Sequence, residues 1–191
     1  MKKILCFISE DFADFEITLL MHKLKNIGKY KIVTVSYTKD IILSESGLKY
    51  IPDKSIDEIH NVDGFEGFII PGGPIKNQKN SLTNLIIKLN NKKIMIAAIC
   101  NAPQYLGRSG ILNNRKYTTS CSKEKIIELK IEDPFPRENY LEERVVIDEN
   151  IITAKGRAFI DFSFAVFEYL NIYVHRESEK NMLLNDILNN K

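Results

Sequence analysis

One cysteine stands where a nucleophile could be presented to a substrate. Cys100 lies between the apolar run 94–99 and the segment 101–103, which ends in Pro103. Alanines flank it on both sides, and a nucleophile on a crowded strand-to-helix turn requires small neighbours. Proline is favourable in the first turn of a helix, whose N-terminus lowers the pKa of a nearby thiol. We therefore expect a reactive Cys100, with a small buried cysteine as the alternative.

Two further segments could complete a site around this cysteine. The apolar run 67–70 ends in Pro71-Gly72-Gly73-Pro74, a loop whose backbone N–H groups could hold an anionic oxygen. Glu16 lies in the first turn of a predicted helix, at the border of its apolar face. A carboxyl there is costly unless it has a partner. Each segment also has an ordinary interpretation, since most Pro-Gly-Gly sequences are turns and most first-turn glutamates complement the helix dipole.

The elements that must position these residues alternate between strand and helix. Apolar or β-branched runs predict strands at 3–8, 31–37, 67–70 and 93–99, a candidate strand at 116–119, and hairpins at 41–51 and 144–154. Helical spacing predicts helices at 17–27, from 81, at 102–106, at 123–129, from about 161 and over 174–189. The hairpin at 41–51 is expected on the edge of the sheet.

This order predicts an α/β fold with a mainly parallel sheet sandwiched by helices, flavodoxin-like or Rossmann-like. No linker or repeat divides the chain, so we expect a single domain over residues 1–191. Ligands of such sheets bind at the carboxyl ends of the strands. The loops after residues 8, 70 and 99 are therefore expected to form the site.

Composition excludes several classes of function. The 191 residues include 27 Lys+Arg and 25 Asp+Glu, a net charge of +2 that gives no electrostatic case for binding nucleic acid. No apolar run approaches the roughly 20 residues that span a membrane. Glu10 and Asp11 follow the short apolar N-terminus, so we expect no signal peptide and a cytoplasmic location. The three cysteines have neither disulfide-scaffold nor zinc-ligand spacing, and we expect no metal and no cofactor.

In combination, these segments resemble the DJ-1/PfpI superfamily, on the class I glutamine-amidotransferase-like fold. The similar segments are 14–16, 70–73, 98–103, 110–112 with 116–119, and 152–156. The resemblance implies that Cys100 is the nucleophile or oxidation centre and that a protonated Glu16 hydrogen-bonds its sulfur. It implies an oxyanion hole made by the backbone N–H groups of Gly73 and Asn101. Members of this family usually form dimers or larger assemblies, so a homodimer is expected.

The chain departs from the family at two positions. Protease-like members have His directly after the cysteine, where this chain has Asn101, and others have His after a Thr-Thr pair, where this chain has Ser120. Peptide hydrolysis needs a group that protonates the departing amine, so protease activity is disfavoured. The three histidines of this chain, His22, His60 and His175, lie elsewhere in the sequence.

Two functions are favoured, and a third, a chaperone or interaction module, would require an exposed apolar surface. The missing histidines slightly favour redox sensing or oxidative-stress protection through Cys100. The alternative is a cysteine-dependent glyoxalase, deglycase or hydrolase acting on small carbonyl compounds, and whether the protein is an enzyme stays open. Three roles also stay open: that of Ser120, that of Cys121 as a resolving cysteine, and that of Lys155 as a cation for an anionic ligand.

Overall fold

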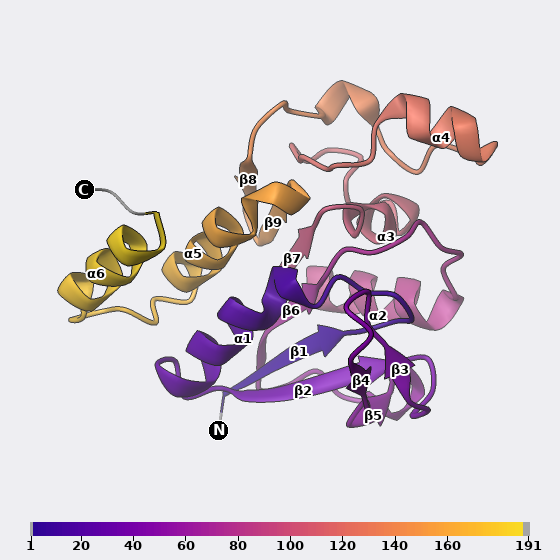
Figure 1. Ribbon diagram of the computed structural model, residues 1–191. Helices are drawn as coiled ribbons and strands as arrows, with labels where there is room; N and C mark the ends of the chain where they lie inside the picture. Colours follow the sequence, from indigo (N-terminus) through magenta and orange to yellow (C-terminus); the bar gives the residue numbers. More distant parts are fainter. Residues whose placement is uncertain (1, 189–191) are drawn as a thin grey trace.

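The computed structural model describes residues 2–188, and a seven-stranded sheet lies at its centre (Figure 1). The strand order is β5-β2-β1-β6-β7-β9-β8, and every pair is parallel except β8 with β9. The strands are β1 (Lys3–Phe7), β2 (Lys31–Ser36), β5 (Lys54–Ser55), β6 (Phe65–Ile70), β7 (Met95–Ile99), β8 (Val145–Asp148) and β9 (Ile151–Ala154). The predicted α/β fold with a mainly parallel sheet is confirmed.

Helices cover both faces of this sheet. They are α1 (Phe15–Asn26), α2 (Asn80–Asn91), α3 (Pro103–Arg108), α4 (Lys123–Leu129), α5 (Phe159–Tyr169) and α6 (Glu177–Leu188). Single 3₁₀ turns occur at Ile56–Glu58, Arg137–Asn139 and Gly156–Ala158. The helix predicted over 174–189 is α6, and residue 189 lies outside the described residues. Over the part of the chain that is described, none of the helices is long and apolar enough to cross a membrane.

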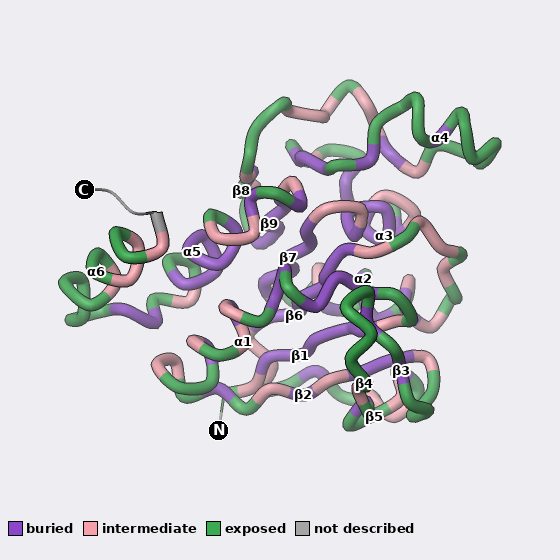
Figure 2. The backbone as a smooth tube through the Cα atoms, in the orientation of Figure 1, coloured by how far each residue is buried: buried purple, intermediate pink, exposed green. Residues whose placement is uncertain are grey.

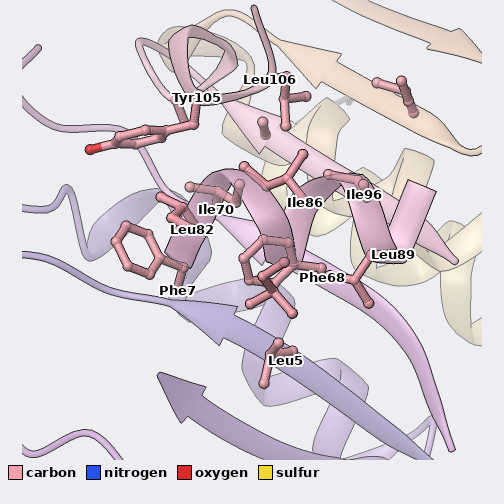
Figure 3. Packing of buried hydrophobic residues seen from close by; sticks show 14 of the residues in the cluster. Leu5, Phe7, Phe68, Ile70, Leu82, Ile86, Leu89, Ile96, Tyr105 and Leu106 are labelled. Atoms are coloured by element: carbon pink, nitrogen blue, oxygen red, sulfur yellow. The ribbon is translucent and has the colours of Figure 1, made fainter. Parts of the chain in front are cut away.

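The two faces of the sheet carry separate hydrophobic cores because side chains alternate along each strand. Leu5 and Phe7 of β1 belong to one core with residues of α2 and α3, and Figure 3 shows Leu82, Ile86 and Leu106 in the same cluster. The residues that alternate with them along β1, Ile4 and Cys6, belong to the core beneath α1 and α5 on the other face. Burial is concentrated along the central strands (Figure 2). Cys6 is buried in this second core.

The hairpin at 41–51 is not on the edge of the main sheet. Its strands, β3 (Ile42–Leu43) and β4 (Lys49–Tyr50), form a sheet of their own, and β5 occupies the edge beside β2. The hairpin is held instead by the loop after β1. Asp11 N–H donates to the Leu43 carbonyl at 2.8 Å, and Glu45 N–H donates to the Phe12 carbonyl at 2.9 Å. This attachment brings the hairpin beside the carboxyl end of β1.

The candidate strand at 116–119 does not form a ladder. Tyr117 makes a single bridge with Tyr140. The next N–H group, that of Thr118, donates to the Thr153 hydroxyl at 2.9 Å instead of to a neighbouring backbone. Since that bond uses the donor a ladder would need, the segment runs as an extended loop toward Ser120.

Candidate active site

An open recess of about 1040 Å³ lies at the carboxyl ends of the central strands. The loops that follow β1, β6 and β7 all contribute to it, as the fold class predicts. The four residues predicted from the sequence, Cys100, Glu16, Gly73 and Asn101, all line this recess. Segments far apart in the sequence therefore form one site.

Cys100 occupies a strained turn between β7 and α3. Its φ of 64° places it in the left-handed region, which is unfavourable for a residue with a side chain. Three hydrogen bonds hold the turn. Cys100 N–H donates to the Ala154 carbonyl at 2.8 Å, and its carbonyl accepts from Ser120 N–H at 2.9 Å and the Thr119 hydroxyl at 2.7 Å. This geometry matches the predicted strand-to-helix turn and presents the half-buried thiol to the recess.

Glu16 is the immediate partner of this thiol. Its side chain is buried, deeper than the border position expected from helical spacing. The backbone N–H of Gly72 donates to Oε2 at 2.7 Å, and the Cys100 thiol donates to the same carboxyl group. Burial outweighs these hydrogen bonds and raises the pKa of Glu16 to about 7. The carboxyl can therefore hold or release a proton near neutral pH.

The expected lowering of the Cys100 pKa is wrong. Burial, followed by the charge of the Glu16 carboxylate, raises the pKa of the thiol to about 12. Hydrogen bonds from the Ser120 hydroxyl and Asn101 N–H oppose this rise but are weaker. Above pH 7 the resting pair consists of a thiol and a carboxylate.

Ser120 takes up a position to which sequence reasoning gave no role. Its hydroxyl donates to the Cys100 sulfur and accepts from the Gly156 N–H at 2.9 Å. It is the residue that replaces the second family histidine, and it supplies a hydrogen bond but no titratable base. Only its place after the Thr-Thr pair could have indicated this contact.

The residues predicted to supply the oxyanion donors, Gly73 and Asn101, line the same recess as the thiol. Asn101 N–H points to the Cys100 sulfur, and no protein group among the described residues accepts from Gly73 N–H. The Asn101 side chain donates to the Gly73 carbonyl at 2.9 Å and so ties the two loops together. Gly73 has a φ of 142°, and a Cβ there would lie 2.8 Å from the Asp11 carbonyl oxygen. Glycine is therefore required at this position.

Substitution of Gly156 by Ala is expected to obstruct the thiol. An added Cβ would lie 2.9 Å from both Cys100 Sγ and Glu16 Oε1, closer than such atoms normally approach. We expect labelling of Cys100 by iodoacetamide to slow about tenfold and the free energy of unfolding to fall by about 1–3 kcal/mol. Gly64→Ala is the control for a loss of stability alone. Its positive φ should lower the free energy of unfolding by about 1–2 kcal/mol, but its added Cβ meets no other atom. Equal labelling of Gly156→Ala and wild type would contradict this packing.

Other residues considered from the sequence lie outside the recess. Cys121 is buried in the core on the α2 face, whereas Cys100 packs against the opposite core. Lys155 forms an ion pair with Glu142. The residues that line the recess include none of the histidines His22, His60 and His175.

Sequence reasoning missed several residues that line the recess. Phe15 and Phe159 line it with their rings 5.6 Å apart, and charged side chains from Asp11, Glu45 and Arg157 complete the lining. Phe159 is partly buried and also packs against the core beneath α1 and α5. Nothing in the local sequence distinguishes these side chains, because the tertiary fold alone brings them together.

Comparison with known proteins identifies the family. The profile of the DJ-1/PfpI family matches residues 2–169. The chain belongs to the DJ-1/PfpI family. The resemblance inferred from the five sequence segments is thus confirmed over nearly the whole chain.

Relatives of this DJ-1/PfpI protein carry different names. The Bacillus subtilis (strain 168) protein named uncharacterized protease YdeA is 29% identical over 188 residues, 97% of this chain and 91% of YdeA. The protein named Deglycase PfpI from Pyrococcus furiosus is 27% identical over 158 residues, 80% of this chain and 89% of PfpI. The crystal structure of the DJ-1 superfamily protein Atu0886 from Agrobacterium tumefaciens superposes with a TM-score of 0.82 at 24% identity, covering 96% of this chain and 97% of Atu0886.

Proposed function

We propose that this DJ-1/PfpI protein is an enzyme that adds the Cys100 sulfur to small carbonyl compounds, namely 2-oxoaldehydes. The observation that carries the proposal is the contact between the thiol and a carboxyl group whose pKa is about 7, within an open recess. A group that titrates near the working pH is suited to taking and returning a proton. A relative named Deglycase PfpI supports chemistry of this kind.

The arrangement suggests a reaction without a cofactor. The Glu16 carboxylate takes the thiol proton while the sulfur of Cys100 bonds to the aldehyde carbon. The N–H groups of Gly73 and Asn101 hold the aldehyde oxygen, which receives that proton and completes a hemithioacetal. Glu16 then transfers the hydrogen on the former aldehyde carbon to the adjacent ketone carbon. The hydroxyl proton on the former aldehyde carbon passes to the ketone oxygen. The product of this step is a 2-hydroxy thioester.

Water completes the cycle. It cleaves the carbon–sulfur bond of the thioester, releases a 2-hydroxy acid and restores the Cys100 thiol. The net reaction converts one 2-oxoaldehyde and one water to one 2-hydroxy acid, so no oxidant or reductant is consumed. No step has an amine leaving group, which is why a carboxyl can act where a protease would use histidine. The name of YdeA therefore does not carry over to this site.

The proposal is tested by measuring lactate formation from methylglyoxal. Wild type is expected to turn over, Cys100→Ala to fall to the background rate, and Cys121→Ala to remain within about twofold of wild type. Cys121 is a suitable control because it is a buried cysteine of the opposite core. Turnover that survives Cys100→Ala would exclude the proposal.

Redox sensing through Cys100 is the second proposal. A sulfinate there would face donors from Ser120 and from a protonated Glu16, the groups that already contact the sulfur. The raised thiol pKa places it second, because the thiolate is the species that peroxide attacks. After mild peroxide, intact mass should show two added oxygens in wild type but not in Glu16→Gln. Equal yields in both proteins would remove Glu16 from this role.

We further propose that the protein is a homodimer. The hairpin exposes Ile41, Leu48 and Ile51, and an apolar hollow of about 400 Å³ lies beside α1. Burial of these groups against a second copy would remove apolar surface from water. Light scattering is expected to give about twice the chain mass of 22.0 kDa. A monomer at micromolar concentration would contradict this expectation.

A further inference from the structure

Two aromatic rings form one wall of the recess that holds Cys100. Phe15 begins α1 and Phe159 begins α5, so the ends of two packed helices bring them together. Their ring centroids lie 5.6 Å apart with planes at 85°, an edge-to-face contact. Phe15 nevertheless remains 50% exposed. A held but half-exposed ring beside a nucleophile offers an apolar surface to whatever enters.

The charged groups of the recess disfavour an anionic ligand. Asp11 and Glu45 line it together with Glu16, against the single guanidinium of Arg157. Lys76 lies 3.9 Å from the Asp11 carboxylate and partly offsets it. Glu45 is close enough for its charge to act on Glu16. With Glu16 ionised, the lining carries more negative than positive charge, which repels a carboxylate or phosphate.

We propose that the preferred substrate is an uncharged 2-oxoaldehyde with an aromatic or bulky apolar group, which packs against Phe15 and Phe159. This inference rests on the proposed carbonyl chemistry and narrows its substrate class. The apolar group contacts the two rings while the aldehyde carbon reaches the sulfur of Cys100. Phe15 is thus a specificity-determining residue. It takes no part in the proton transfers, which belong to Glu16.

The first test compares phenylglyoxal with methylglyoxal. In wild type, kcat/KM is expected to be about tenfold higher for phenylglyoxal, and Phe15→Ala is expected to abolish this preference by lowering the phenylglyoxal value. Tyr169→Ala is the matched control, since Tyr169 is an exposed aromatic residue of α5 outside the recess lining. It should leave the ratio unchanged. A wild-type ratio of one or below, or a ratio that is unaltered in Phe15→Ala, would overturn the inference.

The second test needs no turnover and so separates this inference from the proposed function. Bromoacetone, 2-bromoacetophenone and bromopyruvate all alkylate thiols, and each rate on Cys100 is divided by the rate on free cysteine. Wild type should favour 2-bromoacetophenone about tenfold over bromoacetone and should react slowest with the anionic bromopyruvate. Phe15→Ala should lose the first preference, and Glu45→Gln should raise the relative bromopyruvate rate.

The two tests together distinguish the failures. If neither 2-oxoaldehyde is turned over but Phe15 controls the alkylation preference, the recess selects uncharged aromatic carbonyl compounds and the proposed function is wrong. If turnover depends on Cys100 but the alkylation rates show no aromatic preference, the proposed function survives and the substrate inference fails.

Discussion

Replacement of Glu16 by Gln is expected to lower kcat/KM for methylglyoxal by about 10²- to 10⁴-fold. The amide keeps the size of the side chain and can still accept the hydrogen bond from Gly72 N–H. It cannot take the thiol proton or carry a hydrogen between the two substrate carbons. The change therefore removes proton transfer and leaves the packing in place.

A matched substitution controls for the loss of one negative charge. Glu128→Gln changes an exposed carboxyl of α4, outside the recess, and should leave kcat/KM within about twofold of wild type. If Glu16→Gln retained more than a tenth of the wild-type value, Glu16 would not be the proton carrier.

Glu16→Gln is also expected to stabilise the protein at alkaline pH. The pKa of Glu16 rises from its ordinary value of 4.5 to about 7 in the folded state, chiefly because the carboxyl is buried. Between these values the native state binds more protons than the unfolded state, so stability falls as the pH rises through this window. A glutamine is neutral throughout. The stability of Glu16→Gln relative to wild type should therefore increase by about 3 kcal/mol between pH 4.5 and pH 8.

Urea unfolding at several pH values measures this difference. Most of the change below pH 8 should lie between pH 5 and pH 7. Parallel stability curves for the two proteins would show that Glu16 titrates normally in the fold. If Glu16→Gln gains stability and loses activity, this would also fit a buried carboxyl group that serves catalysis rather than stability.

The order of strands and helices was predictable because each element has a clear local pattern. The continuous apolar run of β1 required burial on both faces, and Leu82, Leu85, Ile86 and Leu89 of α2 have helical spacing. The placement of the hairpin was not predictable, since it depends on the hydrogen bonds that join Leu43 and Glu45 of the hairpin to the loop after β1. Such contacts have no signature in the hairpin's own sequence.

The site was predictable in its members but not in its electrostatics. Cys100, Glu16 and Gly73 meet because the carboxyl ends of neighbouring parallel strands lie together. The pKa of the thiol depends on how far it is buried and on its distance from a carboxylate, neither of which the sequence states. The contact of the Phe15 ring was also not predictable, because its partner Phe159 belongs to α5, which is distant in the sequence.

The most direct test of the central claim is to observe the covalent intermediate on the enzyme. Wild type, Glu16→Gln and Cys121→Ala are mixed with methylglyoxal, quenched in acid within one turnover, digested and mapped by mass spectrometry. The account predicts that the Cys100 peptide of wild type and of Cys121→Ala carries the mass of one methylglyoxal, removable by hydroxylamine as a thioester is. Glu16→Gln should yield no such thioester, because its hemithioacetal cannot rearrange and dissociates on quenching. Turnover by wild type with an unmodified Cys100 peptide, or with the thioester on Cys121, would contradict the assignment of Cys100 as the nucleophile.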